Sequence, residues 1–193
     1  MSLAQTHEKM SFDEFLAWSA RQERGRYEYL DGEIIEMPGE GGAHNFVKGA
    51  LYMALFEAAK RVGLRDQVLT DGMTVHIEHF NRGREPDAAV STTPVADRTA
   101  LCIVDPLIVA EVVSPSSLRD DTGDKLNEYF SVPSIQHYLI VRPDKRLIVH
   151  HMRGDGGKLI TSVVTDPFLR LDPPGLDIDL GPVFEACGPA VAA

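Results

Sequence analysis

The chain has 193 residues, of which 44% are hydrophobic and 25% are charged, and its formal net charge is −10 at pH 7. This length suits one domain with a sizeable core, and the composition is that of a globular protein. Such an acidic chain repels nucleic acid at long range, which excludes binding by phosphate neutralisation alone. Any role on nucleic acid therefore needs a local basic patch, or a metal ion between carboxylates and phosphate.

The apolar runs are too short to cross a membrane, and the N-terminus lacks the basic and apolar segments of a secretory signal. The two cysteines, Cys102 and Cys187, lie far apart and form no CxxC motif. Neither a disulfide nor a metal–thiolate site is indicated. We therefore expect a cytoplasmic protein that has no membrane partner.

The N-terminal part of the chain predicts a tail, a short helix and a hairpin. Residues 1–10 are polar and predict a flexible N-terminal tail. The letters "SFDE", which begin at Ser11, form a capping box that predicts a helix start. Residues 26–37 contain two β-rich arms joined by Asp31-Gly32, which predicts a hairpin with a type I′ turn.

The rest of the chain predicts a long helix followed mainly by strands. Apolar residues at helical spacing over 44–62 predict the long helix, which Gly63 ends, and a second helix is predicted at about 121–130. We infer an α+β fold with an α/β-type three-layer arrangement, as a single domain over 11–182 with a C-terminal tail over 183–193. Strands are predicted at 67–70, 73–79, 87–91, 107–113, 137–143, 146–152, 158–164 and 176–180.

Two of these predicted strands each contain one carboxylate. Asp87 begins "DAAVS" directly after Pro86, and Glu111 lies in the middle of "LIVAEVV", where both strand faces are otherwise apolar. Apolar residues on both faces are typical of a central strand that is covered on two sides. An ionised carboxylate in such a place is costly unless it is paired, hydrogen-bonded or coordinated to a cation.

Two interpretations of these acids remain open from the residues alone. Asp87 and Glu111, on neighbouring strand ends, can share one hard divalent cation through oxygen ligands, as Mg²⁺ sites require. In the alternative, Glu111 pairs with an arginine such as Arg84 or Arg119, and Asp87 caps a turn.

Lys125 favours the first interpretation. It falls early in the second predicted helix, which follows the Glu111 strand, and Tyr129 lies one turn later on the same helix face. A lysine near metal-bound carboxylates can orient a water molecule or stabilise a developing oxyanion. The alternative is a solvated surface lysine.

Four ordered blocks resemble the PD-(D/E)xK nuclease superfamily, and most closely its Uma branch of restriction endonucleases, long classed as a domain of unknown function. The blocks span about residues 11–180. They are "YEYLDGEIIEMP" with His44 at the start of the long helix, "REPDAAVS", "VAEVVSPSS" with the spaced Lys125 and Tyr129, and "EYFSVPSIQHYLIVRPDKRLIVHH".

The resemblance implies a restriction-endonuclease-like mixed β-sheet flanked by helices, and an enzyme that hydrolyses DNA phosphodiester bonds with Mg²⁺ or Mn²⁺. Asp87 and Glu111 match the metal ligands of the family. Its usual motif has a lysine two residues after the glutamate, where this chain has Val113. In related branches this lysine lies in the next helix, and Lys125 is the match there.

Glu28 and His44 match further blocks of the branch and close the site in this interpretation. Alternatives are a solvated hairpin residue for Glu28 and a helix-capping residue for His44. DNA is the expected partner, and the basic residues in 60–65 and 82–84 either contact its backbone or form solvated surface. A two-fold homodimer would present two sites to the two strands of a duplex.

Three functions therefore remain open from the sequence. The first, which we predict, is a metal-dependent endonuclease. The second is a non-catalytic binding or assembly module on the nuclease fold, favoured by Val113 and by the acidic charge. The third is a metal-dependent hydrolase that acts on another substrate, and the fold alone does not decide between them.

Overall fold

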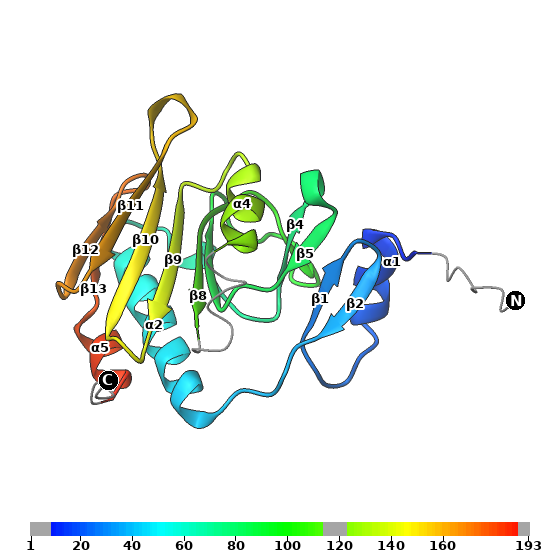
Figure 1. Ribbon diagram of the computed structural model, residues 1–193, viewed down its shortest axis with the longest axis horizontal. Coiled ribbons are helices and arrows are strands. Elements are labelled where there is room, and N and C mark those ends of the chain that lie inside the picture. The colour runs from blue at the N-terminus through cyan, green and yellow to red at the C-terminus, as the bar shows by residue number, and fades with distance from the viewer. Residues whose placement is uncertain (1–8, 114–122, 189–193) are drawn as a thin grey trace, which may run out of the picture.

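Figure 1 shows the computed structural model, which describes residues 9–113 and 123–188. Its centre is a six-stranded sheet with the order β11-β10-β9-β8-β6-β3. β8 pairs in parallel with β9 and antiparallel with β6, so the sheet is mixed. Its strands are β3 (Val68–Thr70), β6 (Ala88–Ser91), β8 (Pro106–Val112), β9 (His137–Arg142), β10 (Leu147–Arg153) and β11 (Leu159–Val164).

β8 is buried on both faces, as its continuous apolar run predicts. Ile108, Ala110 and Val112 point into one apolar core, and Val109 and Val113 point into another. Alternate residues of a strand face opposite sides of a sheet, so Glu111 belongs to the same face as Val109 and Val113.

The first face of the sheet is covered by α2 (Gly42–Arg61), α5 (Gly181–Ala186) and a two-stranded sheet of β12 (Phe168–Leu171) and β13 (Leu176–Asp179). In α2 the buried apolar residues Val47, Leu51 and Leu55 recur at helical spacing, so one side of the helix packs on the sheet. In Figure 1, α5 lies beside α2 at the lower left.

The opposite face is covered by α4 (Asp124–Ser131) and by a five-stranded sheet with the order β2-β1-β5-β4-β7. Tyr129 of α4 and Val75 and Ile77 of β4 are buried together in the second core. The fold therefore has three layers: α2 and α5 with the two-stranded sheet, then the six-stranded sheet, then α4 with the five-stranded sheet. The strands are β1 (Tyr27–Leu30), β2 (Glu33–Glu36), β4 (Thr74–Ile77), β5 (Arg82–Arg84) and β7 (Cys102–Ile103).

The N-terminal elements agree with their local signals. α1 (Phe12–Ser19) begins with the predicted capping box, in which Ser11 and Glu14 bond each other's backbone N–H. Asp31 and Gly32 both have positive φ, at 53° and 89°, as the two central residues of a type I′ turn require. The hairpin of β1 and β2 lies with α1 at the right of Figure 1.

The structure differs from the sequence prediction mainly in short elements. β5, β7 and β12, and the 3₁₀ turns η1 (Arg65–Gln67), η2 (Glu78–Phe80) and η3 (Asp155–Gly157), have too few residues to show a period in sequence. Residues 183–186, predicted as part of a tail, belong to α5, where Val183 and Phe184 are buried. In the described residues, no helix is both long enough and apolar enough to cross a membrane.

Candidate metal centre and active site

The central sheet brings Asp87 next to Glu111. β6 and β8 are antiparallel, and Ala88 is paired with Ala110, so Asp87 lies one residue beyond this pair, opposite Glu111. The Val112 N–H donates a hydrogen bond of 2.7 Å to Asp87 Oδ2, which holds the aspartate against the end of β8. Asp87 and Glu111 are only 3% and 5% exposed.

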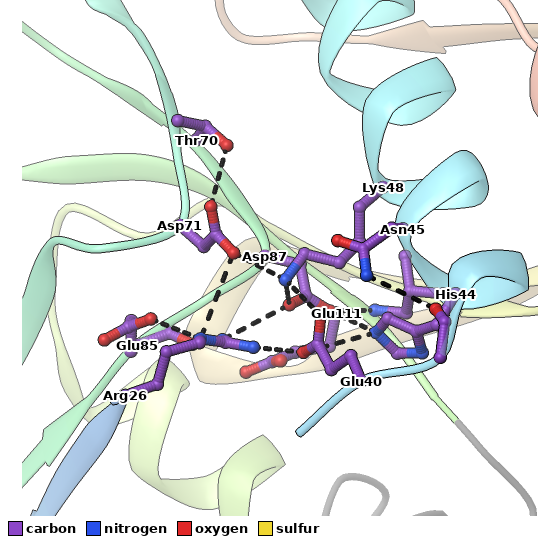
Figure 2. A network of polar contacts seen from close by, with 12 residues as sticks. Arg26, Glu40, His44, Asn45, Lys48, Thr70, Asp71, Glu85, Asp87 and Glu111 are labelled. Atoms are coloured by element: carbon purple, nitrogen blue, oxygen red, sulfur yellow. Dashed lines mark hydrogen bonds and ion pairs between the residues drawn. The ribbon is translucent and has the colours of Figure 1, made fainter. Parts of the chain in front are cut away.

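The Asp87 carboxylate is ionised in this position. Burial raises its pKa, but the neighbouring His44 imidazole, the Lys48 ammonium and the Val112 N–H outweigh burial and lower the pKa to about 2. Lys48 Nζ lies 3.0 Å from Asp87 Oδ1. Both His44 and Lys48 come from the first turns of α2, so the helix start supplies the groups that face Asp87 (Figure 2).

Asp87 belongs to a larger network of charged side chains, drawn in Figure 2, which we call the Asp87 network. Lys48 also contacts Glu40 Oε2 at 2.8 Å and Asp71 Oδ2 at 2.6 Å. Arg26, from just before β1, contacts Glu85 at 2.5 Å and also pairs with Glu40. The members are Arg26, Glu40, His44, Lys48, Asp71, Glu85 and Asp87.

The Asp87 network carries excess negative charge. Among the described residues it contains four carboxylates and two permanent cations, which gives a formal charge of −2 when His44 is neutral. Unbalanced charge in a largely buried site is costly, and a bound divalent cation would neutralise it. The network is therefore suited to a metal ion.

Three members of the network have metal-ligating atoms close together. Glu40, His44 and Asp87 each offer one ligand atom, and these atoms lie within 4.8 Å of one another. His44 Nε2 is 3.6 Å from Glu40 and 3.7 Å from Asp87, and it is buried with no hydrogen-bond partner among the described residues. A buried imidazole nitrogen aimed between two carboxylates fits a metal ligand, and so does the mixed oxygen and nitrogen donor set.

Glu111 has different neighbours. Its Oε1 accepts hydrogen bonds from Lys125 Nζ at 2.9 Å and from the Tyr129 hydroxyl at 2.7 Å, both from α4. Burial, together with the negative charge of Glu111, raises the pKa of Tyr129 well above its usual value. The hydroxyl therefore stays protonated and remains a donor to the carboxylate.

A second network, which we call the Glu111 network, extends from Lys125 toward the five-stranded sheet. Lys125 Nζ lies 3.6 Å from Glu28, and Glu28 accepts a hydrogen bond of 2.6 Å from Arg84. Arg84 also makes a two-pronged contact with Glu128, at 2.7 and 3.1 Å. Glu28, Arg84, Lys125 and Glu128 are each at most 7% exposed, so this network is buried.

These positions decide several open alternatives. Glu28 is buried, so it is no solvated hairpin residue, and Lys125 is no surface lysine. Gly41, rather than His44, is the N-cap of α2. Glu111 pairs with Lys125 and not with Arg84, while Arg119 and the turn before α4 lie outside the described residues.

The basic residues that the sequence suggested for contact with DNA fall into two groups. Arg84 is buried against Glu28 and Glu128, and Arg82 pairs with Asp31 and Glu128, so these arginines are occupied by carboxylates. By contrast, Lys60 and Arg65 have side chains that are 55% and 61% exposed. A DNA backbone would have to meet such exposed residues, since the inner arginines are not accessible to it.

Sequence analysis missed Glu40 and Lys48. Glu40 lies in the glycine-rich connector "PGEGG", which predicts only flexibility. Its signal is a spacing of four residues from Glu40 to His44 and again from His44 to Lys48, and the last two lie on one face of α2. The connector could not be placed against Asp87 without the tertiary fold.

Comparison with known proteins matches residues 12–181 to the family model Uma2, described as "Putative restriction endonuclease". The uncharacterized protein slr1290 of Synechocystis sp. is 27% identical over 91% of this chain and 92% of its own length. The uncharacterized protein sll1609 of the same organism is 26% identical over 71% of this chain and 78% of its own length.

One solved structure has a similar fold. It is a protein of Anabaena variabilis described as a "putative nuclease belonging to DUF820", with a TM-score of 0.69 and 18% identity. The match covers 92% of this chain and 99% of the other. The restriction-endonuclease-like arrangement, a mixed sheet flanked by helices, is therefore confirmed.

Proposed function

Because the chain belongs to the Uma2 family, we propose that it is a metal-dependent endonuclease that hydrolyses phosphodiester bonds of DNA. The observation that carries this proposal is the Asp87 network, whose buried imidazole nitrogen and two carboxylates converge in a site of excess negative charge. The family description and the fold of the Anabaena variabilis protein support a nuclease. The acidic surface is compatible with DNA once a cation lies between the carboxylates and a phosphate.

We assign the metal to Asp87, Glu40 and His44. The bound ion would supply Lewis acidity to a phosphate oxygen and lower the pKa of a water ligand. Mg²⁺ prefers an all-oxygen shell, whereas the imidazole makes this donor set softer. We therefore expect Mn²⁺ to bind more tightly than Mg²⁺.

The Glu111 network has a separate task in this proposal. Glu111 lies opposite Asp87, and Lys125 is 2.9 Å from it. We assign Lys125 to the negative charge that develops on the phosphate during attack, in place of the lysine that is absent at Val113. Tyr129 and Glu28 orient Glu111 and Lys125 through the contacts described above.

A plasmid assay tests the proposal. Supercoiled DNA is incubated with the protein and Mn²⁺, Mg²⁺ or a chelator, and nicked and linear products are measured. We expect nicking with either metal, faster with Mn²⁺, and none with the chelator or with the Asp87→Asn variant. If Mn²⁺ binds by calorimetry but neither DNA nor RNA is cleaved, the nuclease proposal is wrong.

That last result would favour the second function, a nuclease-fold binding module. One observation speaks for it: Glu111 is satisfied by Lys125 and Tyr129 without any metal ion. In such a module these contacts would serve stability alone. Retention of plasmid DNA on the immobilised protein without cleavage would then be the expected behaviour.

A further inference from the structure

β11 is an edge strand whose outer side is open. It lies at one end of the six-stranded sheet, and β10 is its only partner in the described sheet. Five of its six residues are exposed, including Ile160 at 50% and Val163 at 63%. Exposed apolar residues on both faces of one edge strand are unusual in a protein that acts as a single chain.

The hydrogen bonds of the neighbouring strand show which backbone groups of β11 point outward. The Arg153 N–H of β10 donates to the Gln136 carbonyl at 2.9 Å, so the backbone groups of Arg153 point away from β11. The next residue points the other way, because the Gly154 N–H donates to the Lys158 carbonyl at 2.8 Å. Arg153 is paired with Leu159, and the backbone N–H and C=O groups of successive residues point to alternate sides of a strand. The N–H and C=O groups of Leu159, Thr161 and Val163 therefore lie on the open edge.

The open edge carries none of the usual protections against pairing. The strand reads "LITSVV", without a charge, a proline or a glycine, and its six registered pairs with β10 are continuous. Natural edge strands that stay unpaired usually carry lysine, proline or a bulge. The nearest charges in sequence are Lys158 before the strand and Asp166 after it.

We propose that β11 pairs antiparallel with β11 of a second copy of this chain, with Ser162 at the two-fold axis. In this register Lys158 lies opposite Asp166 of the second copy, and the reverse pair forms at the other end. Thr161 then lies opposite Val163, and both residues have the outward backbone groups that an antiparallel ladder needs. The charges flanking the strand are thus complementary only in the antiparallel arrangement.

The proposed dimer keeps the two metal centres apart. Its two-fold axis is perpendicular to the sheet, so the centre of one copy and that of the other lie at opposite ends of the joined sheet. The interface also contains no member of the Asp87 network. We therefore expect each copy to act independently, and loss of the dimer to leave the metal affinity of each chain unchanged.

Sedimentation over a dilution series tests the interface. We expect the parent protein to dimerise, and Val163→Lys to weaken the dimer about tenfold, because each copy loses an apolar pair and gains a charge at the edge. Met53→Lys is the matched control, since Met53 is 50% exposed on the outer face of α2. A parent protein that stays monomeric at the highest concentration, or dissociation by Met53→Lys alone, overturns the proposal.

Val163→Pro is a second variant that separates pairing from folding. The Val163 N–H points outward, so proline removes no hydrogen bond to β10. We expect a monomer with the circular dichroism and the Mn²⁺ affinity of the parent. A folded Val163→Pro protein that dimerises as tightly as the parent would exclude the β11 edge.

Disulfide formation tests the register. In a chain with Cys102→Ala and Cys187→Ala, Ser162→Cys places two thiols opposite each other at the axis, and diamide should oxidise them to a covalent dimer. Leu159→Cys is the control, because Thr165 of the second copy would face it. Cross-linking through position 159 and not through position 162 would show that this register is wrong.

Discussion

Asp87 and Glu111 are both buried carboxylates at neighbouring positions of one sheet, yet their surroundings differ in charge. In the Asp87 network four carboxylates meet two permanent cations. Among the described residues, the buried part of the Glu111 network is balanced: Glu28, Glu111 and Glu128 face Arg82, Arg84 and Lys125, and the exposed Asp31 also pairs with Arg82. Among the described residues, both networks contain buried polar atoms with no hydrogen-bond partner, but only in the Asp87 network is such an atom an imidazole nitrogen, His44 Nε2.

This difference shows that a buried acid in a strand does not by itself identify a metal ligand. An acid whose neighbours balance its charge is stable without an ion, whereas an acid in a negative network gains from one. The Asp87 network therefore has the character of a binding site. In the proposed function, the Glu111 network is a support that holds Lys125.

The largest expected effect is on metal binding. Asp87→Asn should abolish measurable Mn²⁺ binding in calorimetry, because it removes a ligand and one negative charge. Glu111→Gln should weaken binding only about tenfold, the lower end of the range for a residue that acts through the ligands. If both acids share the ion equally, as the sequence resemblance implies, the two variants will lose binding alike, which would contradict the assignment of the ion to the Asp87 network alone.

Removing one cation from each network is the next test. Arg84→Met should lower the free energy of unfolding by about 3–5 kcal/mol, because it removes the closest cation from the buried carboxylates of Glu28 and Glu128. Mn²⁺ should not restore this loss. Lys48→Met should also destabilise the protein, but Mn²⁺ should restore much of the loss, since the ion adds positive charge to the Asp87 network.

Arg170→Ala is the control for both variants. Arg170 pairs with Asp177 on the surface, where its side chain is 58% exposed, and its loss should leave stability unchanged. Thermal and urea unfolding with and without Mn²⁺ measure all three variants. Equal recovery of Arg84→Met and Lys48→Met by the metal would remove the distinction between the networks.

Lys125→Met should reduce DNA cleavage about 100-fold, the scale of losing one electrostatic stabiliser of a transition state. Methionine keeps much of the aliphatic stem and removes the charge. Because Lys125 touches Glu111 rather than Asp87, Mn²⁺ affinity should change little. A variant that cleaves as fast as the parent would exclude Lys125 from the reaction.

The smallest effect is expected for Tyr129→Phe, which removes the hydroxyl that donates to Glu111. Loss of a hydrogen bond to a charged group should cost about 1.5–3 kcal/mol in the free energy of unfolding. Metal affinity should remain that of the parent. A marked change in affinity would mean that Glu111 ligates the ion more strongly than its neighbours suggest.

The structure confirms those parts of the fold that have strong local signals. The capping box at Ser11, the Asp31-Gly32 turn and the apolar face of α2 each depend on residues close in sequence. β7 and α5 depend on distant partners, since Cys102 pairs with Thr74 and α5 packs on α2. Their sequences are too short to specify a structure without that packing.

The site divides in the same way. The acids in β-rich segments and the lysine in the next helix are visible in the residues alone, because a charge within an apolar run is locally anomalous. The sequence thus determined which acids require a partner. Which partner each acid has was decided by the tertiary structure, which brings Glu40, His44 and Lys48 to Asp87, and Lys125 and Tyr129 to Glu111. The physical reason is that charge balance is a sum over side chains close in space, and only the packing of α2 and α4 on the sheet determines which side chains enter that sum.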